Sequence, residues 1–581
     1  MKRTSRGALA LFLSLGLAAG GSATISSAAP SDAERTTDTD STSAWGDRWG
    51  QVNVLSFSDF HGHLTPDDPP FDPEVDPDQT PVGGASHLAA HLKKHRGTAS
   101  ATVSVGDNIG GSTFLSGMFH DEPTIEALDS MGVSASAVGN HEFDEGTNEL
   151  LRMQHGGSHW KDGNYFPGKP YPGAKMQYLA GNVFNKKSGR RILPATHVEE
   201  VNGVKVGFIG LVTPETTSLV SPDGISSVRF DDMAKRANTA ASWLSNAKGV
   251  ETIVVLVHEG GNQEGTYNEC ANLSGPIVEL NERIHSRVDG IVSGHTHAAF
   301  NCTLQDWKGG QRPVVASGDW GRAFNKMTFT VDRRTGDVAK KYSKATNRLT
   351  TRDIRDADVD AIVEKWQEKA GPERAKVVGN VTEDITGDAS GDRGIETPMA
   401  NVVADSILWG TRAQEKGGAQ ISFMNVGGVR ASLLRDQITN GEAVGEVTYE
   451  EAYKVAPFGN LVVTIDMKGS DIKEVLEQQY DPSRGRQYLA MGVSEGFTYT
   501  WDDSKPQGQK VSEMKLDGTA IEDDETYKVS TLSFLQQGGD NFTAFEKGTN
   551  LVGGPEDLDN LVKYLEAMPD LSAPQDRVKG L

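Results

Sequence analysis

Short apolar strands that end in polar side chains recur through the first half of the chain, and this pattern constrains the fold more than any other. The segments are VNVLSFSDFHGH, ATVSVGDNIGG, SASAVGNHEFD, ETIVVLVHEGG and VDGIVSGHTH. Segments of helical character, such as SHLAAHLKKH and DEPTIEALDSMG, lie between them. Alternating strands and helices predict a largely parallel sheet, which collects its functional side chains at the carboxyl ends of its strands. We therefore expect the five strand ends to meet in one place.

The polar residues at these strand ends are of metal-ligand type. They are two aspartates, one asparagine and four histidines: Asp59, His61, Asp107, Asn140, His258, His295 and His297. Oxygen and imidazole donors without a thiolate suit Zn, Mn, Fe, Co or Mg, and seven ligands are too many for one tetrahedral site. The set predicts two divalent metal ions, such as Zn or Mn, with Asp107 as a carboxylate bridge. Each residue taken singly could instead be a hydrogen-bonded loop residue.

The stretch GNHEFDEG, residues 139–146, allows two interpretations. It could begin a helix, because Asn is a good N-cap and acids suit a first turn. Alternatively, Asn140, His141 and Asp144 could belong to the site that the strand ends form.

The ordered blocks DFHGH, GDN, GNHEFD, HEGG and SGHTH resemble the calcineurin-like metallophosphoesterases, specifically the secreted 5′-nucleotidase family. The resemblance extends from about Gln51 to the end of the globular part. It implies two metal sites, one made by Asp59, His61, Asp107 and His297 and the other by Asp107, Asn140, His258 and His295. It also implies that His141 faces the substrate, where it stabilises the transition-state charge or protonates the leaving oxygen, and that Asp144 orients its ring.

The block GDNIGGSTF departs from many relatives, since Asn108 and extra glycines stand where they carry a Thr or an Ala-rich turn. Three further histidines near the motifs, His63, His155 and His159, are assigned to loops.

By the same resemblance the fold is α/β with two domains. A four-layer α/β/β/α metallophosphoesterase domain is expected over residues 51–345, and a smaller α/β substrate-binding domain over residues 378–581. Residues 346–377 are expected to form a helical linker and hinge that lets the second domain deliver a nucleotide to the metals. Val359, Ile362, Val363 and Trp366 lie at helical spacing in this linker, which indicates packing.

The second half supplies candidate substrate contacts. QISFMNVGGVR is a strand that runs into a Gly turn, whose backbone NH groups and Arg430 suit an anion, although a tight turn with a surface Arg would look the same. The resemblance adds Asn425 and Arg393 as substrate contacts. Phe458 in APFGN and Phe542 in GGDNF resemble the two aromatic residues that sandwich a nucleobase, and their glycine neighbours favour exposure. Core packing is the alternative for either ring, and Asp540 is a candidate for the ribose.

The chain carries a formal net charge of −23, which argues against a nucleic-acid binder with a basic surface. Any attraction for phosphate must come from metals or a few placed arginines. The N-terminus has a basic start, the apolar run ALALFLSLGLAAG and then small residues, which predicts a signal peptide over residues 1–29 and a secreted protein, free or associated with the cell surface. A short membrane anchor is the alternative. Residues 30–50 are expected to be a disordered lead-in.

The two cysteines, Cys270 and Cys302, are expected to form a disulfide, because an exported chain meets an oxidising compartment. A loop of that length contributes about 3 to 4 kcal/mol by the chain-entropy estimate.

Together these features predict an exported dimetal phosphohydrolase that acts on nucleoside 5′-monophosphates. A 2′,3′-cyclic nucleotide 2′-phosphodiesterase with 3′-nucleotidase activity and a UDP-sugar hydrolase share the signature, and the sequence does not separate them. A sulfur-ester hydrolase and a non-catalytic nucleotide-binding surface protein are more distant alternatives. A nucleotide is the expected partner, with no nucleic-acid polymer and no stable membrane anchor; the sequence does not define the oligomeric state.

Overall fold

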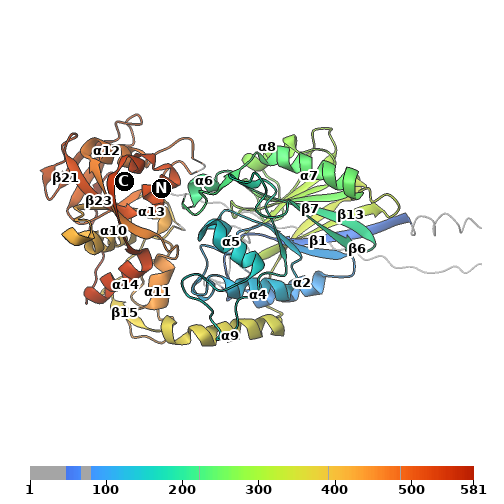
Figure 1. Ribbon diagram of the computed structural model, residues 1–581, viewed down its shortest axis with the longest axis horizontal. Coiled ribbons are helices and arrows are strands. Elements are labelled where there is room, and N and C mark those ends of the chain that lie inside the picture. The colour runs from blue at the N-terminus through green and yellow to red at the C-terminus, as the bar shows by residue number, and fades with distance from the viewer. Residues whose placement is uncertain (1–47, 67–79, 221–222, 390, 485) are drawn as a thin grey trace, which may run out of the picture. The chain divides into compact units, whose positions relative to one another are not determined.

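The computed structural model describes residues 48–66, 80–220, 223–389, 391–484 and 486–581 (Figure 1). The predicted signal peptide and residues 30–47 of the predicted lead-in lie outside the described residues. None of the helices in the described ranges has the length and apolar character that a bilayer span requires.

The first half contains two six-stranded mixed sheets. In the first sheet β1, β2, β3 and β4 run parallel, and β13 pairs antiparallel with both β1 and β14. Its strands, in order across the sheet, are β14 (Lys344–Leu349), β13 (Ala323–Asp332), β1 (Trp49–Phe57), β2 (Ser100–Ser104), β3 (Ala135–Ala137) and β4 (Gln177–Leu179).

The second sheet has a parallel centre with an antiparallel strand at each edge. Its strands, in order, are β11 (Ala299–Gln305), β12 (Gln311–Ser317), β10 (Gly290–Ser293), β9 (Thr252–His258), β7 (Val204–Val212) and β6 (Thr196–Val201). The centre strands are almost continuous runs of buried Val, Ile and Leu, as expected of parallel strands covered on both faces.

The two sheets pack face to face with helices outside each of them. Side chains such as Val54 and Val103 of the first sheet share one buried cluster with Phe208 and Leu256 of the second. Helices α2 (Ala85–His95), α4 (Glu122–Met131) and α5 (Gly146–His155) pack on the outer face of the first sheet. Helices α7 (Met233–Lys248) and α8 (Pro276–Arg283) cover the second (Figure 1). The predicted α/β/β/α layering is therefore confirmed.

Helix α9 (Ala357–Arg374) occupies most of the predicted linker. The Asp356 side chain accepts a hydrogen bond from Val359 N at 3.1 Å and so caps the helix. Val359, Val363 and Trp366 join the buried cluster of the first sheet, and the indole NH of Trp366 donates to Glu126 of α4 at 2.8 Å. The helical spacing noted in the sequence thus reflects packing against the first half.

The second half is a smaller α/β unit. Its five-stranded sheet has the order β19 (Met491–Val493), β16 (Ile421–Asn425), β23 (Thr526–Leu532), β18 (Leu461–Lys468) and β24 (Thr549–Glu556). Helices α10 (Pro398–Thr411) and α14 (Asp557–Ala567) contribute to one buried cluster of this unit, and α12 (Gly469–Glu477) contributes to another.

Shorter elements complete the description. They are α3 (Phe114–Gly117), α6 (Thr216–Leu219), α11 (Tyr449–Val455), α13 (Ser533–Gln536), the paired strands β5 (Val183–Asn185) with β8 (Val228–Phe230) and β15 (Val377–Asn380) with β17 (Glu446–Thr448), and a small sheet of β22 (Thr519–Ala520), β21 (Val511–Leu516), β20 (Phe497–Trp501) and β25 (Val578–Lys579).

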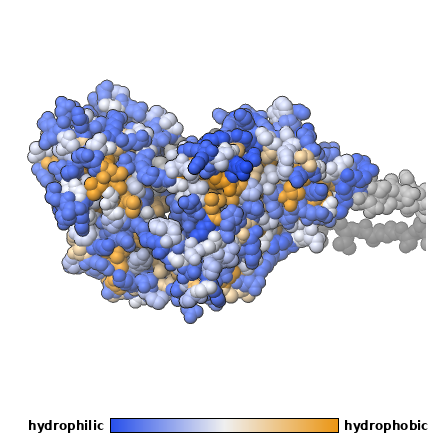
Figure 2. Space-filling model, in the orientation of Figure 1, coloured by the Kyte–Doolittle hydropathy of each residue, from blue (hydrophilic) through white to orange (hydrophobic). Residues whose placement is uncertain are grey.

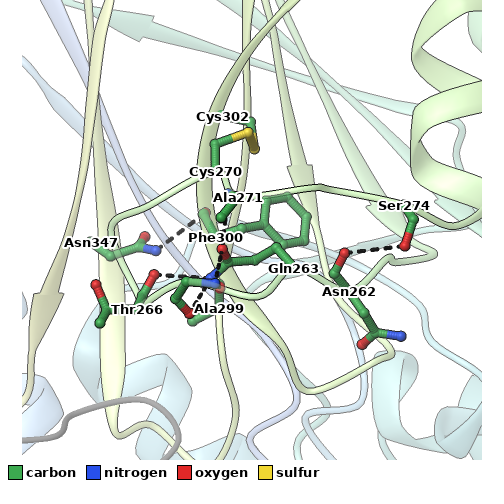
Figure 3. Close-up of a disulfide and its surroundings, with 11 residues drawn as sticks. Asn262, Gln263, Thr266, Cys270, Ala271, Ser274, Ala299, Phe300, Cys302 and Asn347 are labelled. Atoms are coloured by element: carbon green, nitrogen blue, oxygen red, sulfur yellow. Dashed lines mark hydrogen bonds between the residues drawn. A yellow bond between two sulfur atoms is a disulfide. The ribbon is translucent and has the colours of Figure 1, made fainter.

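Cys270 and Cys302 form a disulfide, with their Cα atoms 5.1 Å apart (Figure 3). It ties the loop after β9 to the edge strand β11, where Cys302 is buried. The Gln263 side chain supports the same loop, because its amide donates to the carbonyls of Thr266 and Ala299 at 3.0 and 3.1 Å.

The surface agrees with the acidic composition. Figure 2 shows a face on which hydrophilic residues predominate and hydrophobic residues form small separate patches. Scattered patches of this kind are ordinary for a protein surface and do not by themselves mark a docking site.

The packing of Trp366 predicts a large stability loss on truncation. Trp366→Ala should lower the free energy of unfolding by about 3 to 5 kcal/mol, because it removes a buried indole and leaves a cavity. Urea unfolding followed by circular dichroism measures this, with Glu368→Ala, an exposed position of the same helix, as the control. Equal midpoints for the two variants would contradict the packing described for α9.

Candidate functional site

The strand ends of both sheets meet as the sequence predicts. Asp59, His61, Asp107 and Asn140 follow β1, β2 and β3 of the first sheet, while His258, His295 and His297 come from β9 and β10 of the second. Asp107 Oδ2 lies 2.9 Å from His258 Nε2 and 3.8 Å from His61 Nε2. Asp59 Oδ1 lies 3.9 Å from His258 Nε2 and 3.8 Å from His297 Nε2. The two sheets thus contribute donors to a single cluster.

Three groups of side chains in this cluster have ligand atoms close enough together to hold a metal ion, and one of them combines His61 and Asp107 with His141. Asp59, His61 and His297 offer ligand atoms within 4.8 Å of one another, and so do Asp107, His258 and His295. The first of these two groups is the first predicted set without Asp107. The second group is the second predicted set without Asn140.

Several of these side chains have a donor atom whose lone pair is free to bind a metal ion. His61 Nε2 and Asn140 Oδ1 are buried without a hydrogen-bond partner among the described residues. Nδ1 of His61 contacts the Gly110 carbonyl at 2.7 Å, and Nδ1 of His258 contacts the Val105 carbonyl at 3.0 Å. A ring that donates through Nδ1 presents the Nε2 lone pair to a cation. The residues present therefore fit divalent metal ions.

The backbone at the cluster is strained. Five of the seven candidate ligands have left-handed backbone: Asp59 (φ 51°), His61 (φ 46°), Asp107 (φ 47°), His295 (φ 79°) and His297 (φ 60°). Such conformations are uncommon for residues other than glycine and concentrate at functional sites, where the surrounding structure enforces them. The strained backbone conformations thus fall on the candidate metal ligands that the sequence predicts.

Glu142 braces the ligand turns, a role that the sequence analysis missed. Its carboxylate accepts backbone hydrogen bonds from Asp107, Asn108 and Gly139 at 2.8, 2.9 and 2.5 Å. The Asn108 side chain also donates to Glu142 and to Ser136 Oγ. Asn108 therefore links the turn after β2 to β3 and to the GNHEFD turn.

The GNHEFDEG stretch forms a short 3-10 turn at His141–Phe143, and helix α5 begins only at Gly146. Asn140 lies at the N-cap position of this turn, but its side chain makes no capping hydrogen bond, so the amide does not serve as a helix cap. His141 Nδ1 lies 2.8 Å from Asp144 Oδ2. Burial opposes the charged imidazole, but the carboxylates of Asp144 and Asp107 outweigh it and raise the pKa of His141 to about 9. The His141–Asp144 pair can therefore keep the imidazole of His141 protonated beside the candidate metal ligands.

Two candidate substrate residues of the second half reach the same region. The Phe458 ring lies 6.3 Å from the His141 ring at an interplanar angle of 21°, and the Arg430 guanidinium lies 5.7 Å from the Phe458 ring centre. His141 and Phe458 line a cavity of about 380 Å³. Burial lowers the pKa of Arg430 in the second half and the charge of Asp144 in the first half opposes this, so the two halves interact electrostatically here.

The other candidate contacts form a polar group around Asp540. Asn425 Nδ2 donates to Asp540 Oδ2 at 2.7 Å, and Arg393, Arg484 and Arg486 act electrostatically on this carboxyl group. Burial and the neighbouring Arg486 and Arg430 lower the pKa of Arg393 to about 9. Converging guanidinium groups favour an anionic ligand.

Phe542 does not lie where the sequence analysis expected it. Its side chain is 0% exposed and packs in the core with Phe423 and Phe545, with the Arg484 guanidinium 4.9 Å from its ring. The expectation of an exposed ring is wrong, because the two 3-10 turns Gly539–Asn541 and Thr543–Lys547 place this residue beneath α12. Phe534 of α13 is only partly buried.

Asp319 is a second residue that the sequence analysis missed. Its Oδ2 atom lies 2.9 Å from Nδ1 of His297, which orients that ring toward Asp59. The signal was present in ASGDWGR, where the aspartate follows β12 in the same way as the other strand-end acids. His63 stacks on Trp320 at 4.5 Å, and His155 is exposed at the end of α5, so neither belongs to the cluster.

The four-layer fold, with acids, an amide and imidazoles at the strand ends of both sheets, defines a protein of the metallophosphoesterase class, whose fold implies divalent metal ions. A family model described as calcineurin-like phosphoesterase matches residues 52–299. A second model, described as 5′-nucleotidase, C-terminal domain, matches residues 377–547. The chain belongs to the calcineurin-like phosphoesterases that carry a C-terminal 5′-nucleotidase domain.

Similar proteins cover most of the chain. It is 33% identical over 473 residues to the endonuclease YhcR of Bacillus subtilis, covering 81% of this chain and 36% of that protein. It is 32% identical over 486 residues to the cell wall protein Lmo0130 of Listeria monocytogenes, covering 80% of this chain and 60% of that protein. The crystal structure of a 5′-nucleotidase precursor from Thermus thermophilus matches with a TM-score of 0.71 and 25% identity, over 91% of this chain and 99% of that one.

The contact between His297 and Asp319 predicts a role in metal affinity. Asp319→Asn should weaken Mn²⁺ or Zn²⁺ binding about 10- to 100-fold, because partners that orient a ligating histidine have effects of that size. Titration calorimetry on the metal-stripped protein measures it, with the exposed Asp337→Asn as the control. Unchanged affinity in Asp319→Asn would show that this carboxylate does not support a metal ligand.

Proposed function

We propose that this chain is an exported, metal-dependent 5′-nucleotidase that releases phosphate from nucleoside 5′-monophosphates. The observation that carries the proposal is the convergence of seven donor side chains from two sheets beside the His141–Asp144 pair. The two family models and the Thermus thermophilus 5′-nucleotidase precursor support the substrate class.

Two divalent ions of the Zn or Mn class are the proposed cofactors. Asp59, His61, Asp107 and His297 would hold one, and Asp107, Asn140, His258 and His295 the other. When bound, such a pair supplies a hydroxide nucleophile and stabilises charge on the phosphoryl oxygens. The donor set does not select between Zn and Mn, since both accept these ligands.

His141 would act on the leaving group. Asp144 holds the proton on Nδ1 at 2.8 Å, so Nε2 is the nitrogen that can give a proton to the departing nucleoside oxygen. The Asp144 carboxylate, which raises the pKa of His141, favours the protonated ring. A general acid placed in this way contributes about 10² to 10⁴ in rate.

The second half would bind the nucleotide. Arg430 and Arg393 would contact the phosphate, Asn425 and Asp540 the ribose, and Phe458 the base. Stacking on one ring contributes roughly 1 to 3 kcal/mol and tolerates different bases. Phe534 is a better second ring than the buried Phe542, because it keeps exposed surface in the same turn region.

The domain bounds 51–345, 346–377 and 378–581 and the hinge role of α9 belong to this proposal. So does export, which rests on the basic and apolar N-terminal pattern and on the disulfide. The 2′,3′-cyclic phosphodiesterase and UDP-sugar hydrolase alternatives remain beside it; they would act on a cyclic phosphodiester and on a sugar pyrophosphate in place of a phosphate monoester.

A substrate panel tests the proposal. The purified mature protein should release phosphate from AMP faster than it turns over 2′,3′-cyclic AMP, UDP-glucose or single-stranded DNA. A chelator should abolish the release, and added Mn²⁺ or Zn²⁺ should restore it. His141→Ala should lower kcat about 10² to 10⁴-fold because it removes the proton donor.

His155→Ala, at an exposed histidine of α5, is the matched control and should keep full activity. A higher rate on cyclic AMP or UDP-glucose would select one of those alternatives. Absence of turnover on all four substrates with metal restored would overturn the enzyme assignment in favour of a nucleotide-binding protein.

A further inference from the structure

Asp121 stands at the beginning of helix α4 but does not cap it. An aspartate at this N-cap position normally accepts hydrogen bonds from the first backbone NH groups of its helix. The Asp121 side chain makes no such bond, and its backbone is left-handed at φ 63°. The residue is also buried, with 7% of its surface exposed. Its carboxylate is therefore turned away from its own helix and bound elsewhere.

The carboxylate of Asp121 holds the glycine turn that follows Asp107. Gly110 N donates to Oδ2 of Asp121 at 3.1 Å, and the Ser116 hydroxyl donates to Oδ1 at 2.6 Å. The Ser116 hydroxyl also lies 2.6 Å from that of Thr124, which belongs to α4. These contacts fasten Gly110 to the beginning of α4.

The same glycine presents its carbonyl to a candidate metal ligand. Gly110 O lies 2.7 Å from Nδ1 of His61. Because a carbonyl oxygen can only accept a hydrogen bond, His61 donates through Nδ1 and keeps a lone pair on Nε2. That Nε2 atom is buried without a hydrogen-bond partner among the described residues. The position of Gly110 therefore sets both the tautomer and the direction of the His61 ring.

The glycine turn also packs directly against the acid pair of the site. Gly110 has a φ of 80°, and a Cβ added there would lie 2.2 Å from His141 O and 2.7 Å from Asp144 Oδ2. A glycine is required here for both reasons. The hydrogen bond from Gly110 N to Asp121 thus holds a turn that contacts a metal ligand and the His141–Asp144 pair.

Stability alone does not account for Asp121. Burial raises the pKa of its carboxyl group to about 6, so the charged form is less favourable in the folded chain than in water. Its two hydrogen-bond donors, Gly110 N and Ser116 Oγ, are neutral. A buried carboxylate with neutral partners and a left-handed backbone costs folding free energy. This cost favours a role in the site.

We propose that Asp121 is a positioning residue for the proposed dimetal centre. It acts through Gly110, whose carbonyl it keeps against Nδ1 of His61, and so it strengthens binding of the ion whose ligand set contains His61. The inference rests on the proposed metal-dependent function and adds to it a residue outside the seven candidate ligands.

The metal affinity of the chelator-stripped protein tests this role. Asp121→Gly removes the carboxylate and suits the left-handed backbone, so it adds no strain. Titration calorimetry should show Mn²⁺ binding weakened about 10-fold for one of two ions, because residues that support a ligating histidine have effects of at least that size. Asp121→Asn keeps an acceptor oxygen and tolerates a left-handed backbone, so it should retain most of the affinity.

Asp129→Ala is the matched control. Asp129 also lies in α4 and accepts backbone NH groups of another segment, those of Lys175 and Met176. Its Mn²⁺ affinity should equal that of wild type. At saturating Mn²⁺, Asp121→Gly should regain kcat on AMP with an unchanged KM, which a general folding defect would not allow.

Equal Mn²⁺ affinities of Asp121→Gly and Asp129→Ala would overturn the proposal. If Asp121→Gly does not fold by circular dichroism, Ser116→Ala removes the donor to Oδ1 and should weaken Mn²⁺ binding about 2-fold or more. Unchanged affinity in Ser116→Ala would then contradict the role of Asp121. A wild-type chain that binds neither Mn²⁺ nor Zn²⁺ would overturn the proposed function, and this inference with it.

Discussion

The contacts of one carboxylate, that of Asp107, connect every part of the candidate centre. Its Oδ1 accepts the backbone NH of His141 at 2.9 Å, and its Oδ2 lies 2.9 Å from His258 of the other sheet. The turn around it has no spare room, since a Cβ added at Gly139 would lie 2.1 Å from Asp107 Oδ1. The backbone NH of His141 and the pKa values of His141 and His258 therefore depend on this side chain, and Glu142 holds its turn in place.

The second half places groups for an anion and a ring next to that centre. Phe458 and Arg430 lie beside His141, while Asn425, Asp540 and Arg393 form a polar group of their own. An acidic chain can bind a phosphate ester in this way, because a few placed guanidinium groups and the proposed metal ions would provide the attraction that the net charge of −23 does not. The proposed nucleotidase activity follows from this local arrangement.

Much of the centre could be predicted because strand-end residues are set by local sequence: a buried strand followed by Asp, Asn or His puts that side chain at the sheet edge. The buried face of α9 could also be predicted from local sequence, since Val359, Val363 and Trp366 repeat at helical spacing. Burial of Phe542 was not readable, because it depends on how two short turns fold beneath α12. The pairing of His297 with Asp319 joins the ends of two different strands, β10 and β12, so the aspartate is visible in the sequence but its partner is not.

The most direct test of the dimetal centre is anomalous diffraction from crystals of the Mn²⁺-loaded protein. Two peaks about 3.5 to 4 Å apart are expected, one beside Asp59, His61 and His297 and the other beside Asn140, His258 and His295, with Asp107 between them. A single peak among these residues, or none, would contradict a dimetal centre built from the strand ends of both sheets.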